Sequence, residues 1–227
     1  MPAPHRRALP AASWISIALL AVTLAWDLAG LDPAMARLAG SAWGFPLRND
    51  WFLYGVLHEG GRRLAWMLAG ALCLGVWWPV GPLARIPQRQ RAQLAVTTLL
   101  ATFAVSLIKN ASHTSCPWDL AEFGGIARHA SHWSGAFDGG PGRCFPAGHA
   151  SAGFAFAGGY FAFLATDPRL ARRWLAVAGA GGLVLGLAQQ WRGAHFMSHT
   201  LWTAVVCWLV ACGVDALWTR AARSQEA

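Results

Sequence analysis

The chain has 227 residues, of which 56% are hydrophobic and only 12% are charged. This composition is too apolar for an ordinary soluble domain and indicates an integral membrane protein. The formal net charge is +8, but the basic residues form no clustered patch on a soluble surface, which argues against nucleic-acid binding.

Six windows of the chain carry almost no charge and have the length, roughly 17 to 25 residues, that spans a bilayer core. We therefore expect one all-α domain over residues 1–227, an integral membrane bundle of six transmembrane helices. The predicted spans are about 14–31, 64–80, 92–108, 149–166, 173–190 and 199–218. Arg6 and Arg7 precede the first span as in a secretory signal peptide, but its apolar stretch is too long for a signal core, so we expect an uncleaved helix.

Between the first two predicted spans, residues 32–63 are semi-polar and rich in aromatic side chains. Such side chains settle at the bilayer interface. We therefore expect an interfacial helical segment that lies partly along the membrane surface. The glycine pair Gly60-Gly61 is a helix stop signal and should end this segment before the second span.

Arginine placement predicts the orientation in the membrane. With six spans, both termini share a side with the connections 81–91 and 167–173, and the basic residues of that side stand in short segments with few acids. These basic residues are Arg6, Arg7, Arg85, Arg89, Arg91, Arg169, Arg172, Arg173, Arg220 and Arg223. The bias favours cytoplasmic termini in a bacterial inner membrane, with the other connections in the periplasm. Anionic lipid headgroups are the natural counterpart of the inner arginines.

The chain contains one lysine, Lys109, which directly follows the third predicted span. Lysine is a compact point charge that can aim at one phosphate oxygen, and arginine does not replace it without a change of geometry. Two histidine-bearing segments follow, at 146–149 (Pro-Ala-Gly-His) and 193–199 (Gly-Ala-His-Phe-Met-Ser-His). A solitary lysine ahead of two such segments indicates a phosphate site at a membrane face.

Cys116 and Cys144 both fall in the outer connection between the third and fourth predicted spans. On the oxidising side of a membrane we expect such a pair to form a disulfide, which would stabilise the fold by roughly 3 kcal/mol. Two unpaired thiols are the alternative. Cys73, Cys207 and Cys212 fall in predicted spans and are expected to be apolar filling residues.

The segment 146–149 marks the change from loop to helix. Gly148 lets the backbone approach an anion closely, and the helix start offers free amide donors and the positive end of a dipole. His149 beside these amides can donate a proton to a leaving oxygen. The structural alternative is a helix-capping loop with an interfacial histidine.

The segment 193–199 connects the last two predicted spans. His195 can attack phosphorus if a partner orients its other ring nitrogen. His199 follows four residues later and shares a helix face with His195 if the segment is helical. The pair also has a two-histidine metal spacing, but the glutamate of the metalloprotease pattern is missing, so we expect no metal. Two unrelated interfacial histidines are the other alternative.

Together these segments resemble the type 2 phosphatidic acid phosphatase superfamily, whose motifs are Lys-x6-Arg-Pro, Pro-Ser-Gly-His and Ser-Arg-x5-His-x3-Asp, in that order. The first motif matches at Lys109 and Pro117, and the second matches at 146–149 except for its serine. The third matches at His195 only. The resemblance covers about residues 90–220 and implies a membrane lipid phosphatase.

The resemblance also implies a mechanism. His195 would attack phosphorus in line and form a phosphohistidine that water hydrolyses, and His149 would protonate the leaving lipid oxygen. Lys109 and the amides near Gly148 would hold the equatorial oxygens, since phosphoryl transfer depends mainly on positioning and charge neutralisation. The substrate would be a phosphorylated lipid of the outer leaflet, and no metal or other cofactor would be required.

Three of the departures from the family pattern replace charged groups. Cys116 and Gln189 stand where the family has arginines, and His199 stands in place of the aspartate that orients the nucleophile. The loss of two guanidiniums is costly, because each charge-assisted contact contributes roughly 1.5–3 kcal/mol.

Replacements for these groups are near at hand in the sequence. Arg192 and Arg143 could each bind the phosphate, or could be surface charges facing lipid headgroups. His199 could accept a hydrogen bond from His195, although it supplies no negative charge. Asp119 could orient His195 instead, or could cap a turn.

Three other functions stay open at this point. A lipid phosphotransferase would use the same residues and pass the phosphoryl group to an acceptor other than water. A catalytically inactive membrane protein would keep the fold and bind anionic headgroups. A transporter would carry ionisable residues inside its spans, for which Asp27 and Asp215 are the only support.

Overall fold

The computed structural model describes residues 5–226, and its elements are all helical apart from two isolated β-bridges. The long helices are α1 (His5–Leu28), α4 (Gln88–Ala111), α7 (Pro168–Trp191) and α8 (Met197–Glu226). Four stretches within the described residues are long and apolar enough to cross a bilayer, and they are Ala11–Leu28, Gln88–Ala111, Pro168–Trp191 and Met197–Ser224. The prediction of an all-α chain with several membrane-spanning helices is confirmed.

The two remaining predicted spans have a different form. The span predicted at 64–80 is helical in α3 (Gly61–Leu74), after which the chain turns and forms the 3₁₀ helix η2 (Gly81–Arg85). The span predicted at 149–166 consists of short helical pieces: η5 (Gly148–Ala150), α5 (Ser151–Phe154), η6 (Ala155–Gly158) and α6 (Gly159–Leu164). Neither reaches the length and apolarity of the other four, so the six-span count stays a prediction.

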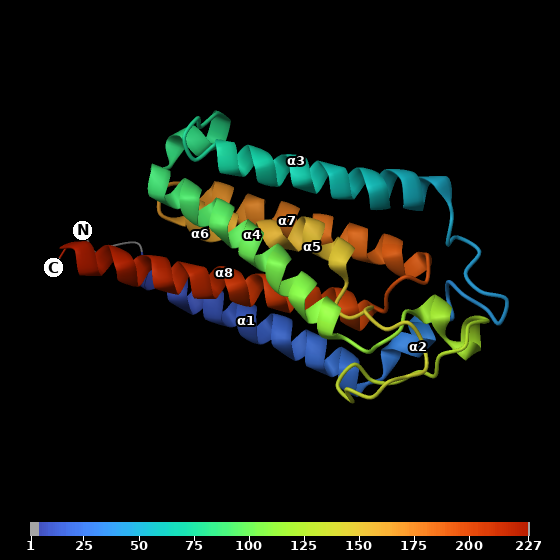
Figure 1. Ribbon diagram of the computed structural model, residues 1–227. Helices are drawn as coiled ribbons and strands as arrows, with labels where there is room; N and C mark the ends of the chain where they lie inside the picture. Colours follow the sequence, from blue (N-terminus) through green and yellow to red (C-terminus); the bar gives the residue numbers. More distant parts are fainter. Residues whose placement is uncertain (1–4, 227) are drawn as a thin grey trace.

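The pieces from η5 to α6 form the centre of the bundle and pack against α4 and α7 (Figure 1). Their small residues allow this close approach. A Cβ atom added at Gly153 would lie 2.1 Å from the backbone nitrogen of Gly182, and one at Gly159 would lie 2.2 Å from Nε1 of Trp174. Only residues without side chains fit at these contacts.

The two ends of the bundle differ in character. α1 begins and α8 ends at one end, where the turns after α3 and α6 also lie (Figure 1). The loop 112–147 and the segment 37–51 lie together at the opposite end (Figure 1). A small buried cluster that includes Phe45, Phe123 and Phe196 packs these loops against each other. This second end carries the three sequence motifs.

The predicted interfacial segment 32–63 is helical only near its two ends, in α2 (Leu31–Ala36) and in the π-helix η1 (Phe52–Gly60). The prediction that Gly60-Gly61 stops a helix is wrong, because both glycines have helical φ angles, −64° and −58°, and η1 continues directly into α3. Gly61 packs closely against Leu185 of α7, where a Cβ atom would lie 2.8 Å from a side-chain methyl carbon. Tertiary packing therefore overrides the low helix propensity of glycine.

Candidate active site

Three segments that are distant in the sequence line one cavity of about 360 Å³. Lys109 lies in the last turn of α4, Gly148 and His149 begin η5, and His195 lies in the turn between α7 and α8. All four residues line the cavity. The structure therefore brings together the lysine, the glycine and the two histidines that the sequence indicates.

Backbone hydrogen bonds fix the loops of the site relative to one another. They join the loop after α4 and the loop before η5 to each other and to the segment that precedes and begins α8. The bonds run from Trp118 N–H to the Gly193 carbonyl (3.0 Å), from Ala147 N–H to the His199 carbonyl (3.2 Å) and from Cys144 N–H to the Thr114 carbonyl (2.9 Å). Because these are main-chain contacts, the relative placement of the three motifs does not depend on side-chain rotamers.

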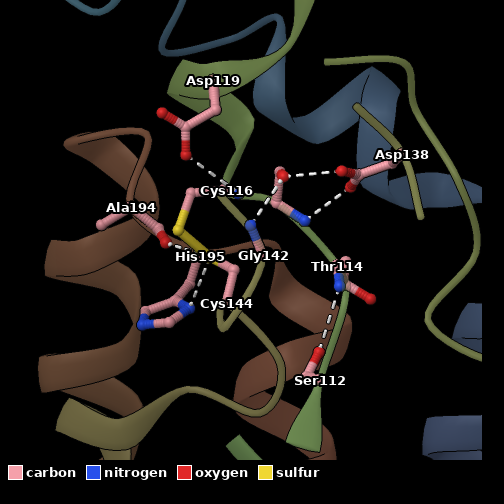
Figure 2. Close-up of a disulfide and its surroundings, with 10 residues drawn as sticks. Ser112, Thr114, Cys116, Asp119, Asp138, Gly142, Cys144, Ala194 and His195 are labelled. Atoms are coloured by element: carbon pink, nitrogen blue, oxygen red, sulfur yellow. Dashed lines mark hydrogen bonds between the residues drawn. A yellow bond between two sulfur atoms is a disulfide. The ribbon is translucent and has the colours of Figure 1, made fainter. Parts of the chain in front are cut away.

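The structure joins Cys116 and Cys144 in a disulfide, with their Cα atoms 5.2 Å apart (Figure 2). Beside it, Ser115 donates hydrogen bonds from its backbone N–H (2.6 Å) and its hydroxyl (2.7 Å) to the buried carboxylate of Asp138. Cys116 lines the cavity in the position that the family pattern gives to an arginine. The first motif therefore contributes Lys109 to the site and no guanidinium.

Lys109 and Gly148 lie directly against each other. A Cβ atom at residue 148 would contact Cδ and Cε of Lys109 at 3.5 and 3.8 Å. The lysine side chain therefore runs along the start of η5, where no side chain caps the helix. Glycine at position 148 leaves the backbone open toward the Lys109 side chain.

The ring of His149 is half-buried and stacks on the ring of His58, with centroids 3.7 Å apart. Its Nε2 atom is buried and has no hydrogen-bond partner among the described residues. An unsatisfied nitrogen in a cavity wall costs free energy unless a ligand or water contacts it. The Nε2 atom is thus open to a hydrogen bond with a molecule bound in the cavity.

His195 is only 4% exposed. Its Nδ1 atom lies 3.4 Å from Sγ of Cys144. Burial holds the pKa of His195 well below 6.5, and the positive charge of Lys109 acts in the same direction. The imidazole is therefore neutral at pH 7, as a nucleophile requires.

Two residues were predicted to orient the nucleophile. His199 lies on the first turn of α8, its ring centroid is 5.8 Å from that of His195, and its buried Nδ1 has no hydrogen-bond partner among the described residues. Asp119 is not brought to His195. Its carboxylate accepts the backbone N–H of Cys116 at 3.3 Å and caps the short helix η3 (Pro117–Asp119). Figure 2 shows this contact. Burial raises the pKa of Asp119.

The two candidate arginines behave differently. Arg192 is buried, and its guanidinium donates to the Arg48 carbonyl (2.9 Å) and to Oε1 of Gln189 (2.8 Å). It lies behind the cavity surface, which Gln189 forms in its place. Arg143 is exposed, has a φ of 57° and is not a lining residue. The structure does not bring Arg143 to the site.

Two lining residues were missed by the sequence reasoning. His58, on η1, faces Gln189, and Arg62, on α3, pairs with Glu59 at 2.8 Å. Arg62 is the guanidinium that lines the cavity. Burial, followed by the charge of Arg192, lowers the pKa of His58. The sequence feature that could have indicated His58 and Arg62 is the cluster of charged and histidine residues at 58–63 in an apolar surrounding.

Among the described residues, one group has metal-ligand spacing, formed by Cys144, His195 and His199. The sulfur of Cys144 is committed to the disulfide and is not a thiolate. Two histidines then remain, which is fewer than the three or four protein ligands of a typical zinc site. This group therefore lacks the ligand set of a typical zinc site.

The two acidic residues that could indicate a transport pathway have structural partners. Asp27 lies near the end of α1, where it accepts indole N–H bonds from Trp133 (3.1 Å) and Trp202 (2.7 Å). Asp215 on α8 accepts a hydrogen bond from the Gln93 amide (2.9 Å). These contacts hold helices and loops together.

A family model described as the PAP2 superfamily matches residues 91–223, which is more than half of the chain. The matched region agrees with the range of about 90–220 that the motifs give, and it contains Lys109, His149 and His195. No curated protein and no solved structure matches the chain. The chain belongs to the PAP2 superfamily.

Proposed function

We propose that this chain is a membrane phosphatase that hydrolyses a phosphate monoester or a pyrophosphate of a lipid, with His195 as nucleophile. Membership of the PAP2 superfamily supports the phosphatase class. The observation that carries the proposal is the single cavity lined by Lys109, Gly148, His149 and His195. This is the set of groups that phosphoryl transfer through a histidine requires.

The reaction takes two steps. Nε2 of His195 attacks phosphorus, the bond from phosphorus to the lipid oxygen breaks, and His149 gives that oxygen a proton. Water then attacks the phosphohistidine, His149 takes a proton from it, and the phosphorus–nitrogen bond breaks to release phosphate. Lys109 and Arg62 neutralise the charge of the transferring group, which is the main catalytic contribution in such reactions.

The shape of the cavity supports a lipid substrate. Ala65, Trp66 and Ala69 of α3 and Leu99 of α4 also line the cavity, and these two helices pack against each other. An apolar lining of this kind suits a hydrocarbon chain, whose burial contributes about 0.8 kcal/mol per CH₂ group. A water-soluble phosphate ester would leave this part of the cavity unfilled.

We infer that the chain crosses a bacterial inner membrane six times and that the site faces the periplasm. The arginine bias supports cytoplasmic termini. The start of α1, the end of α8 and the connections at 81–91 and 165–168 lie at one end of the bundle, and the loop 112–147 lies at the other (Figure 1). Cys116 and Trp118 of that loop line the cavity. The oxidising periplasm also suits a disulfide.

Release of inorganic phosphate from a panel of lipid phosphates tests the proposal. Purified wild-type protein should release phosphate from at least one lipid, and His195→Ala and Lys109→Ala should each lower the rate at least ~100-fold. His113→Ala is the matched control, because His113 is exposed in the same loop region and does not line the cavity. No release from any lipid, with headgroup binding retained in both variants, would show an inactive binding protein.

The same panel separates a hydrolase from a phosphotransferase. The transferase uses the same lysine and histidines, so the variants do not distinguish the two. A hydrolase releases phosphate in water alone. Phosphate transfer that occurs only after addition of a lipid acceptor would assign the second activity.

A further inference from the structure

The Cys116–Cys144 disulfide is part of the active site. Cys116 lines the cavity, and Cys144 is fully buried behind it. The bond joins the loop that follows Lys109 to the loop that precedes η5. Figure 2 shows the sulfur atoms lying directly beside the ring of His195.

The sulfur of Cys144 contacts the nucleophile on the side away from the attacking nitrogen. It lies 3.4 Å from Nδ1 of His195 and 2.9 Å from the Ala194 carbonyl oxygen. A disulfide sulfur carries no hydrogen, so it can only accept a hydrogen bond. The contact is favourable only when the proton of the neutral ring is on Nδ1. Nε2 then has a free lone pair.

No carboxylate takes this position among the described residues. The family pattern has an aspartate four residues after the nucleophile, where this chain has His199. Asp119 is turned toward the N–H of Cys116 (Figure 2). Cys144 supplies the contacts on this side of the ring: its disulfide sulfur lies 3.4 Å from Nδ1 of His195, and its backbone also hydrogen-bonds the ring.

We propose that Cys144 is a positioning residue: its disulfide sulfur accepts the Nδ1–H bond of His195 and keeps Nε2 free to attack phosphorus. The inference rests on the proposed function of His195. It makes catalysis dependent on the oxidised form of the cysteine pair. A dithiol such as dithiothreitol would supply two electrons and two protons, convert the pair to two thiols and itself become a cyclic disulfide. The reduced Cys144 can then donate its S–H to Nδ1, which favours the ring form with the proton on Nε2.

Two single variants separate this role from that of a simple loop tether. Cys116→Ala and Cys144→Ala both remove the disulfide, but only Cys144→Ala removes the sulfur beside His195. The thiol left in Cys116→Ala can donate to Nδ1 of His195, whereas Cys144→Ala leaves no sulfur there. We therefore expect kcat of Cys116→Ala to fall about 10-fold below that of Cys144→Ala, with KM changed less than about 2-fold. Equal kcat values in the two variants would overturn the proposal, because a tether predicts the same loss in both.

A readout that needs no activity keeps the proposal separate from the proposed function. Histidine ¹⁵N chemical shifts, with His195 assigned through His195→Gln, report which ring nitrogen carries the proton. The oxidised wild type should show the Nδ1–H form, and dithiothreitol should shift His195 toward the Nε2–H form. The Cys116→Ala/Cys144→Ala double variant should not respond to the reductant. An unchanged His195 signal on reduction of the wild type would refute the positioning role even if the enzyme is inactive on every lipid tested.

Discussion

The ring of His58, at the end of a π-helical segment, stacks on the ring of His149 with centroids 3.7 Å apart. π-Helical turns recur at functional sites because they turn a side chain out of the regular α-helical register. Here the turn brings a residue from before α3 against the proposed general acid of η5. The stacking holds the His149 ring in one plane, with its unpaired Nε2 atom buried at the cavity.

We predict that removal of this stacking slows catalysis. His58→Ala should lower kcat about 10-fold, because His149 gains orientations in which it does not reach the leaving oxygen. His58→Phe keeps an aromatic ring and should retain most of the wild-type kcat. Initial rates of phosphate release measure both. Equal loss in the two variants would show that the nitrogen atoms of His58, and not its stacking, matter.

Arg62 is expected to supply a guanidinium contact to the phosphate. Arg62→Ala should lower kcat/KM about 10-fold or more, the scale of one lost charge-assisted contact. Arg63→Ala is the matched control, because Arg63 is the next residue of α3 and does not line the cavity. Loss of the same size in both variants would assign the effect to headgroup attraction at the membrane surface.

Substitution of Arg192 should destabilise the folded protein, whereas substitution of Arg143 should not. Arg192→Ala removes a buried guanidinium that donates to the Arg48 carbonyl and to Oε1 of Gln189, which should lower the free energy of unfolding by about 1–3 kcal/mol. Arg143→Ala removes an exposed side chain and should leave both stability and activity at the wild-type level. Thermal unfolding in detergent, followed by intrinsic tryptophan fluorescence, measures the stabilities. A large loss of activity in Arg143→Ala would show that Arg143 contributes to the site.

The protein should lose stability as the pH falls below about 6.5, the ordinary pKa of histidine. Burial lowers the pKa of His195 in the folded protein, and the pKa of His58 and His132 are lowered mainly by burial as well. The unfolded chain therefore binds protons at a higher pH than the folded protein. The stability that these neutral rings contribute is therefore fully present above about pH 6.5. It declines as the pH falls from about 6.5 toward the lowered pKa values of the folded protein.

Thermal unfolding over a pH series checks this expectation. His195→Gln cannot take up a proton, so its melting temperature should fall less on acidification than that of the wild type. The comparison uses the difference between the two proteins at each pH, so that carboxylates common to both cancel. Parallel curves would show that His195 keeps an ordinary pKa in the folded protein.

The sequence predicts the motif residues of the site because each motif is local. Lys109 and Gly148 were recognised from the residues beside them, and Cys116 and Cys144 could be paired because both fall in one loop. Four spans were also predictable, since long charge-free helices have a strong hydropathy signal. The glycine-rich segment 149–166 has a weaker hydropathy signal, because its small residues are there for close packing and not only for hydrophobicity.

The remaining parts of the site depend on tertiary contacts. His58 reaches His149 only because η1 continues through Gly60 and Gly61 into α3, where packing against α7 supports a helix that glycine alone does not favour. Arg143 stands near the second motif in the sequence, but its positive φ angle belongs to an exposed turn that leaves its side chain outside the cavity. Distance along the chain therefore predicted proximity poorly for these side chains.

The central claim is that His195 becomes phosphorylated during turnover. Protein incubated with a ³²P-labelled lipid phosphate and quenched in alkali should carry label in the peptide that contains His195, since phosphohistidine survives alkali. His149→Ala should also carry the label there if a good leaving group replaces the lipid alcohol, and His195→Ala should carry none. Turnover by the wild type with no label at His195, or with label on another residue, would contradict the account.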